Sequence, residues 1–335
     1  MKTMTPAERF SERRSRPLRI AIAWTLTLLT LSTWADEPIF SSHDAQGLGP
    51  DAGVMRRDPS DIIQVGETYY VWYSRGPVSH GYDATIWYAE STDGRSWRER
   101  GEALARGDTG SWDEQSVFTP NILVAEGRYW LFYTAVAKPF VNTTSKTAIG
   151  IAWAESPRGP WTRTEGNPVV SASSDVSLFD SMRVDDACLI VRDGRYWLYF
   201  KGRQMNRSWM ETKLGVAIAD KPEGPYVKHP GNPLVGGGHE VMVWPFRQGV
   251  LSLINIGPEG IGRTLQYSDD GLRFSRVCDL DSKTIPFAAG FFRPEAFKDR
   301  GRGEMVEWGI ETARRDGQLP YLRRVDCIWP ELTLP

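Results

Sequence analysis

Acidic residues stand directly before several aromatic-rich runs of the chain. Asp58 precedes the first run, and Asp185 and Asp186 precede the third. His239 and Glu240 precede a fourth, less regular run. Two carboxyl groups that face one cleft can act as the acid and the base of glycosidic bond cleavage, and a third can set their pKa values. A single Asp-Pro or Asp-Asp pair is equally explained by turn formation, but recurrence at one position favours a site.

The runs that follow these residues belong to an internal repeat. Residues 66–76, 127–136 and 194–203 each alternate aromatic and aliphatic side chains after a tight turn, which is the pattern of a β-strand. Each run leads to a second run and then to a turn, STDG, SPRG or KPEG, that is followed by an aromatic residue. Two looser copies follow near residues 249–257 and 302–312.

The repeat predicts an all-β fold, a five-bladed β-propeller, because five units of roughly 55 to 65 residues are each worth about four strands. A β-sandwich is the alternative, but its strands do not repeat as hairpin pairs with a recurring turn aromatic. The inner strands of a propeller begin at one face of the central channel, so the acids before them should converge. We expect residues 55–335 to form this catalytic domain and residues 36–54 to form an extended lead-in.

The composition excludes some partners and favours others. The chain has 335 residues, a net charge of -2 and a pI of about 6.2. A nucleic-acid partner is not expected, because it would require a basic stripe. The 14 Trp, 12 Tyr and 13 Phe residues suit short strands, and they also suit the stacking of sugar rings.

The first 35 residues are typical of an export signal peptide. Arginines precede the apolar run at residues 20–35, which ends in small residues, so cleavage after Ala35 is expected. A retained membrane anchor is the alternative, although the run is short for a membrane span. We expect a secreted or periplasmic protein without stable membrane association after signal cleavage.

The residues that bind metals or form disulfides are sparse. The three cysteines include no CxxC pair, and four histidines do not favour a His-rich metal site, so no cofactor is expected. A structural divalent cation in the central channel remains an alternative, because carboxylates and water can bind calcium. A disulfide between Cys278 and Cys327 is compatible with an oxidising compartment, but spacing alone does not decide it.

Six segments, in this order along the chain, resemble glycoside hydrolase family 117, a relative of the five-bladed propellers of family 43. The resemblance covers roughly residue 54 to the C-terminus, and the combination is far more specific than any one segment. The segments are RDPSDIIQVGETYYVWYS (57–74), WDEQSVFTPNILV (112–124), FDSMRVDDACLIV (179–191), GHEVMVWPF (238–246), FFRPEAF (291–297) and EWGIE (307–311).

This resemblance implies an exo-acting, inverting hydrolase that releases 3,6-anhydro-L-galactose from the non-reducing end of neoagaro-oligosaccharides or of a related algal galactan fragment. Asp58 would be the general base, and Asp186 the second carboxylate, which modulates pKa values and holds the substrate. The acid would be His239 or Glu240. The family usually has proline after the third-blade acid, where this chain has Ala187, so the choice between Asp185 and Asp186 stays open by one residue.

Other polar and aromatic residues fall near the same face and are expected to bind an oligosaccharide substrate. For each of them the alternative is a structural role, either in packing or as a solvent-exposed side chain. They are Gln115, Thr119, Asn121, Lys201, Arg203, Arg293 and, as a stacking face, Trp244. His80, in a long loop of the first blade, is expected either to lie at the edge of the pocket or to face solvent.

The oligomeric state stays open between a monomer and a homodimer. The resemblance implies a dimer that swaps an N-terminal helical extension between its subunits. This chain has only about 20 residues between the expected cleavage site and the first blade, which leaves little room for such an extension.

Three other functions share this pattern. A family 43-like arabinofuranosidase or xylosidase would use the same three carboxylates on a pentose. A five-bladed phosphorylase would need a basic cluster for phosphate. A non-catalytic carbohydrate-binding propeller would show no turnover at all.

Overall fold

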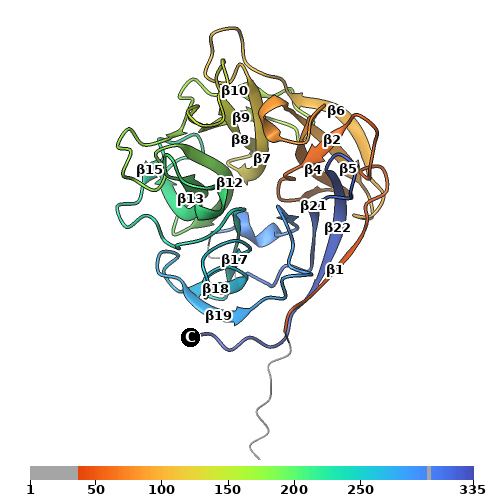
Figure 1. Ribbon diagram of the computed structural model, residues 1–335. Coiled ribbons are helices and arrows are strands. Elements are labelled where there is room, and N and C mark those ends of the chain that lie inside the picture. Colours follow the sequence, from red (N-terminus) through yellow and green to blue (C-terminus); the bar gives the residue numbers. More distant parts are fainter. Residues whose placement is uncertain (1–36, 300–302) are drawn as a thin grey trace, which may run out of the picture. The chain divides into compact units, whose positions relative to one another are not determined.

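The computed structural model describes residues 37–299 and 303–335. Within these ranges the chain is built almost wholly of strands and contains no α-helix. Five antiparallel sheets surround a common centre, so the predicted all-β, five-bladed propeller is confirmed (Figure 1). Three short 3-10 helices lie in the connections, namely η1 (Gly81–Asp83), η2 (Trp209–Glu211) and η3 (Pro294–Phe297).

The first three blades are antiparallel sheets whose strands follow one another in the sequence. Blade one consists of β2 (Met55–Arg57), β4 (Thr68–Gly76), β5 (Thr85–Ser91) and β6 (Arg98–Leu104), with β3 (Ile63–Val65) also paired to β4. Blade two consists of β7 (Ser116–Ala125), β8 (Arg128–Val136), β9 (Ala148–Ala154) and β10 (Thr162–Arg163), with β11 (Val170–Ser171) paired to β9. Blade three consists of β12 (Arg183–Arg192), β13 (Arg195–Arg203), β14 (Lys213–Ala219) and β15 (Val227–Lys228).

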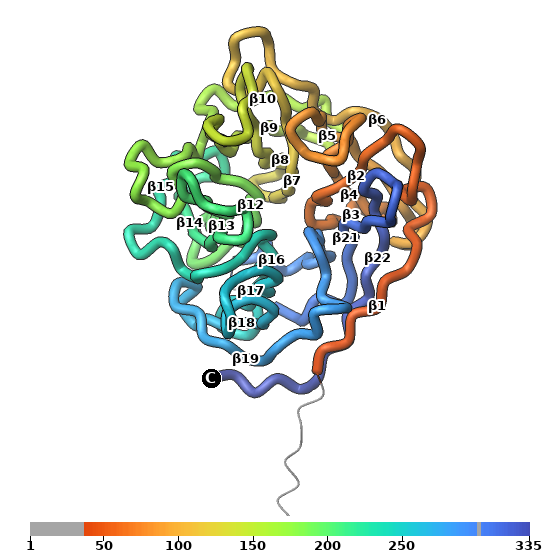
Figure 2. Tube along the Cα trace, viewed as in Figure 1, coloured from red at the N-terminus to blue at the C-terminus, as the bar shows by residue number. Residues whose placement is uncertain are grey.

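The last two blades complete the ring. Blade four consists of β16 (Met242–Phe246), β17 (Gly249–Ile254), β18 (Thr264–Ser268) and β19 (Ser275–Asp279). Blade five contains β20 (Gly290–Phe291), β21 (Trp308–Ala313) and β22 (Tyr321–Ile328), and its outermost strand is β1 (Ile39–Asp44). The segment expected as a lead-in thus supplies a strand, and Figure 2 shows β1 running beside β22. Pairing of the two ends of the domain in one blade removes an open edge from the ring.

The hydrophobic core lies between neighbouring blades. Trp161, which follows the SPRG turn of blade two, packs edge-on against Trp72 of blade one at 5.8 Å. Tyr226, which follows the KPEG turn of blade three, packs in the same way against Phe132 of blade two at 5.7 Å. Trp97, after the STDG turn, joins the cluster between blades five and one. The prediction that these turn aromatics fill inter-blade space is confirmed.

The structure describes all three cysteines but not the expected signal peptide. Cys188, Cys278 and Cys327 are all free thiols, so the disulfide considered between the last two is not formed. The expected signal peptide, residues 1–35, lies outside the described residues. Among the residues that are described, no helix has the length and apolarity needed to cross a membrane.

Phe40→Ala should lower the free energy of unfolding by about 3–5 kcal/mol, as the loss of a buried aromatic ring commonly does. Phe40 is 4% exposed and packs edge-on against Trp329 at 5.4 Å, so its loss opens the seam where β1 closes blade five. Its neighbour Ile39 is 54% exposed, and Ile39→Ala is the matched control with little expected effect. Denaturant unfolding of both variants measures the difference. An equally small effect of both substitutions would contradict the closing role of β1.

Candidate active site

Four residues from four blades adopt a left-handed backbone conformation beside one central space. The angle φ is 51° at Asp58, 42° at Thr119, 56° at Asp186 and 47° at Ala288, and all four residues line that space. The β7–β8 and β12–β13 ladders also shift register around Thr119 and Asp186. Such values strain residues other than glycine, and bulges re-aim side chains beside active sites. The backbone therefore turns these side chains out of the sheets and toward the centre.

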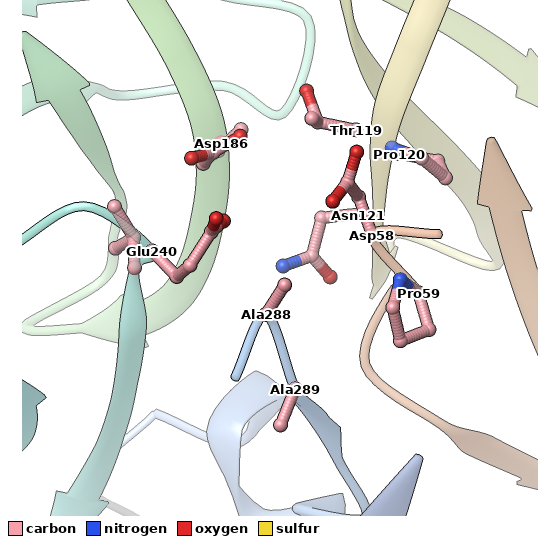
Figure 3. A pocket seen from close by; sticks show the side chains of 11 residues that line it. Asp58, Pro59, Thr119, Pro120, Asn121, Asp186, Glu240, Ala288 and Ala289 are labelled. Carbon is pink, nitrogen blue, oxygen red and sulfur yellow. The ribbon is translucent and has the colours of Figure 1, made fainter. Parts of the chain in front are cut away.

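Three carboxyl groups face one another across this space. In Figure 3, Asp58 lies on one side, and Asp186 and Glu240 lie on the other. All three side chains are buried. They border a cavity of about 240 Å³ and a smaller adjoining space of about 30 Å³. The arrangement is that of a small, polar pocket with acids on opposite walls.

The Asp58 carboxylate is held on one oxygen only. Arg57 Nε donates a 2.7 Å hydrogen bond to Asp58 Oδ2, and the Asp58 backbone N–H donates to Thr312 Oγ1 at 2.9 Å. Asp58 Oδ1 is buried and has no hydrogen-bond partner in the described part of the protein. This oxygen is therefore available to accept a hydrogen bond from water or substrate.

Asp186 shares the ammonium of Lys201 with its neighbour. Lys201 Nζ lies 2.5 Å from Asp186 Oδ2 and 3.8 Å from Asp185 Oδ2. Burial raises the pKa of Asp186 to about 6; Lys201 opposes this shift, whereas the charges of Asp185 and Asp58 add to it. Burial opposes the charge of Lys201, yet the surrounding carboxylates hold its pKa above the ordinary value. Lys201 therefore stays charged while the acids around it compete for protons.

Glu240 is the carboxyl group most disposed to keep its proton. Burial raises the pKa of Glu240 well above its ordinary value, and the negative charge of Asp186 raises it further, while Lys201 lowers it. Because the two acids interact, the first proton that the pair takes up lies mainly on Glu240, whose pKa is raised more than that of Asp186. In a hydrolytic site, a protonated carboxyl of this kind is suited to act as a general acid.

His239 is held as a neutral imidazole beside Glu240. Its Nδ1 lies 2.9 Å from the carbonyl oxygen of Trp209, which can only accept, so Nδ1 carries the hydrogen. Burial, followed by the positive charge of Lys201, lowers the pKa of His239 to about 2. Its Nε2, 3.7 Å from Glu240 Oε1, therefore carries a lone pair. Glu240, and not His239, has the proton to give.

Most of the residues expected from the sequence meet at this cavity. Asp186 has the left-handed backbone of Asp58 and Thr119, whereas Asp185 pairs across the strands with Lys201, although both acids line the cavity. The expected residues that line the 240 Å³ cavity are Asp58, Thr119, Asp186, Lys201, Arg203, His239 and Glu240, together with His80. Asn121 lines the smaller space, where its Oδ1 accepts from the backbone N–H of Asp61 and Ile122.

Three expected substrate ligands lie elsewhere. Trp244 is 1% exposed and packs against Phe291 and Trp329, so it is inter-blade core and offers no stacking face. Arg293 is buried in an ion pair with Asp61 and does not line either space. Gln115 donates through Nε2 to the Tyr82 carbonyl at 2.9 Å and supports a wall of the cavity from behind.

Several cavity residues were missed by sequence reasoning. Arg57 and Arg183 had a local signal, because each lies one or two residues before an acid on an inner strand. The others come from loops between strands and carry no repeat pattern. The missed residues that line the cavity are Arg57, Tyr82, Phe118, Asn142, Arg183, Trp209 and Thr212.

The described residues do not indicate a metal centre. Within residues 37–299 and 303–335, no group of three or more His, Cys, Asp or Glu side chains is arranged to hold a metal ion. The cations that face the carboxylates here are arginine and lysine side chains.

Comparisons with known proteins agree with the geometry. The family model of glycosyl hydrolases family 43 matches residues 53–187. A solved family 117 glycoside hydrolase produced by the marine bacterium Zobellia galactanivorans is 32% identical, with a TM-score of 0.78, and the match covers 87% of this chain and 90% of that one. The chain belongs to glycoside hydrolase family 117. It is a glycoside hydrolase, as the sequence resemblance implied.

More distant structures share the fold alone. Fructan 1-exohydrolase IIa from Cichorium intybus is 13% identical, with a TM-score of 0.58, and the match covers 85% of this chain and 57% of that one. A family 43 beta-xylosidase/alpha-arabinofuranosidase from a compost microbial metagenome is 14% identical, with a TM-score of 0.56, covering 88% and 98%. No curated protein matches the chain.

Glu240→Gln should raise the thermal midpoint of unfolding, and more so at pH 8 than at pH 4. The folded pKa of Glu240 lies above the unfolded one, so the folded state retains a proton that the unfolded state releases. Wild-type stability therefore falls as pH rises through the interval between the two values, and the glutamine variant escapes this loss. Thermal unfolding across pH measures the effect.

Glu259→Gln is the matched control, because Glu259 is an exposed glutamate of the same blade and its replacement should leave the pH dependence unchanged. A Glu240→Gln difference of the same size at pH 4 and pH 8 would contradict a buried, protonated Glu240.

Proposed function

We propose that this family 117 enzyme is an exo-acting, inverting hydrolase that releases 3,6-anhydro-L-galactose from the non-reducing end of neoagaro-oligosaccharides, or of a related algal galactan fragment. The observation that carries the reaction type is the placement of Asp58 opposite Glu240 and Asp186 across one small cavity (Figure 3). The family membership supports the choice of an algal substrate, and the cavity supports exo action.

The reaction follows from the protonation states. Glu240 gives its proton to the glycosidic oxygen as the bond to the leaving sugar breaks. Asp58 Oδ1 takes a proton from the water that attacks the anomeric carbon from the opposite side. Attack from the face opposite the leaving group inverts the anomeric centre. Burial keeps the proton on Glu240 before reaction, and the negative charge of Asp186 adds to this effect.

The shape of the site supports removal of one terminal sugar. A cavity of about 240 Å³ is below the roughly 300 Å³ at which sites for drug-sized ligands begin, so it suits a single ring. Trp209 is 51% exposed, lines the cavity and meets the His239 ring edge-on at 5.1 Å. Its free face takes the stacking role first expected for Trp244 and would receive the next sugar.

Asp58→Asn should lower turnover of neoagaro-oligosaccharides by about 10²–10⁴-fold while binding is retained. The amide cannot take the proton of the attacking water, and a general base of this kind contributes about 10²–10⁴-fold. Thin-layer analysis of products and calorimetric binding measure the two properties, with Asp108→Asn at an exposed aspartate as the control. Binding without turnover by the wild type would instead indicate a sugar-binding propeller. Turnover of aryl pentosides alone would indicate a family 43-like pentosidase.

Glu240→Gln should slow cleavage of the natural linkage by about 10²–10⁴-fold and should slow aryl glycosides with good leaving groups much less. A good leaving group departs without a proton, so only cleavage of the natural linkage, whose leaving group is poor, depends on the general acid. His239→Gln should show no such dependence, because His239 is neutral at working pH. Steady-state kinetics with both substrate types separates the two residues. A leaving-group dependence confined to His239→Gln would assign the acid to the histidine.

A further inference from the structure

Two arginines stand side by side in the wall of the cavity. Arg183 of β12 and Arg203 of β13 are direct partners across the antiparallel ladder, and both line the cavity. Like charges placed directly opposite each other destabilise a sheet. Arg183 is only 1% exposed, so bulk water does little to screen this repulsion. Because this arrangement of charges costs stability, its presence in the cavity wall indicates a functional role for the two arginines.

Neither arginine has an acidic partner. Among the residues that the structure describes, no carboxylate lies within 4.0 Å of Arg183 or Arg203 to form an ion pair. The nearby Asp185 is paired with Lys201 on the neighbouring positions of the same two strands. Burial and then the charge of Arg183 lower the pKa of Arg203, while Tyr82 and Asp185 oppose this shift. Burial and the neighbouring Arg183 therefore both disfavour the charged form of Arg203.

The two guanidinium groups differ in how firmly they are held. Arg183 donates to the carbonyl oxygens of Asn142, at 2.9 Å, and of Ser145, and it lies over the Tyr82 ring at 5.3 Å. Within the part of the chain that the structure describes, the Arg203 side chain makes one weak hydrogen-bond contact, from Nη2 to Met182 Sδ at 3.8 Å. Among the same residues, the buried Nε atoms of both arginines have no hydrogen-bond partner. Arg203 thus presents free donors, and Arg183 is held beside it by backbone carbonyl oxygens.

The other charges of the cavity compensate this pair only in part. Three carboxylates, Asp58, Asp185 and Asp186, face two cations, Arg57 and Lys201, which leaves one negative charge against two guanidinium groups. Glu240, the remaining acid, keeps its proton. An oxyanion is the group that a planar guanidinium binds best, through two parallel hydrogen bonds.

We propose that Arg203, positioned by Arg183, is a subsite for a negatively charged substituent on the substrate sugar, either a sulfate ester or a carboxylate. The inference rests on the proposed function and deepens it: of the two substrates proposed, it favours a related galactan fragment that carries a negative charge over the neutral neoagaro-oligosaccharides. The site should favour an anionic sugar over a neutral one, because a neutral sugar leaves both guanidinium groups without an ion-pair partner in a buried site.

The first test measures binding of inorganic sulfate by calorimetry to the wild type and to Arg203→Gln. Sulfate should bind the wild type and should bind Arg203→Gln at least tenfold more weakly. Arg195→Gln, at the exposed far end of the same strand, is the matched control and should bind like the wild type. Arg203→Lys keeps the charge without the planar fork and should be intermediate, which guards against misfolding of the glutamine variant. Equal sulfate affinity of all four proteins, or none in the wild type, would overturn the proposal.

The second test compares sulfated, carboxylated and unsubstituted galactan oligosaccharides of the same length. Arg203→Gln should lower kcat/KM for the preferred anionic substrate at least tenfold more than for the neutral one, and the preferred anion identifies the substituent. An equal effect on all three substrates would overturn the subsite while leaving the hydrolase intact. Sulfate binding without hydrolysis of any galactan would reject the proposed function and retain the subsite. Turnover that depends on inorganic phosphate would overturn the proposal, because the arginines would then hold an attacking phosphate.

Discussion

The buried ammonium of Lys201 is the interaction on which the site depends. It lies 2.5 Å from Asp186 and 3.8 Å from Asp185, which stand on the adjacent strand of the same blade. Removal of one member of a buried ion pair typically costs about 3–5 kcal/mol, because the remaining charge is left uncompensated. Lys201 also lowers the pKa of His239 and opposes the rise at Glu240. This cation thus permits several acids to share a cavity, and it adds to the burial that keeps His239 neutral.

The backbone must bear strain to bring these groups together. Asp58, Thr119 and Asp186 each hold a left-handed conformation, which costs of order 1–3 kcal/mol per residue. The packed seams between blades supply the compensating stability, and the pairing of β1 with β22 completes the last blade. A propeller suits this task because every blade contributes one strand end to the same centre. The chemistry is therefore assembled from residues far apart in the sequence.

The sequence was sufficient for the blades and for the convergence of the acids at one cavity, because both follow from one repeat, but it left open the choices between Asp185 and Asp186 and between His239 and Glu240. Asp58, Asp186 and Glu240 stand at equivalent strand ends, and strand ends of a propeller converge. Trp244 was misplaced because the repeat does not tell which face of an inner strand meets the next blade. Arg293 was misplaced because its partner, Asp61, lies 232 residues away and leaves no local trace.

Other features of the site could not be predicted from the sequence, because they depend on strand register, on the path of a loop and on burial. The pairing of Arg183 with Arg203 depends on a ladder that shifts register between Asp185 and Cys188, and such a shift has no sequence signature here. Trp209 reaches the cavity from a loop whose path depends on its neighbours. Protonation states also required the structure, since burial is their leading cause.

The central claim is that Glu240 holds a proton at neutral pH and that His239 does not. Infrared difference spectroscopy of the wild type against Glu240→Gln at pH 7 tests it directly. The account predicts the carbonyl stretch of a protonated carboxylic acid in the wild type and its loss in the variant. A wild-type spectrum that shows only ionised carboxylate at this position, together with imidazolium signals from His239, would contradict the account.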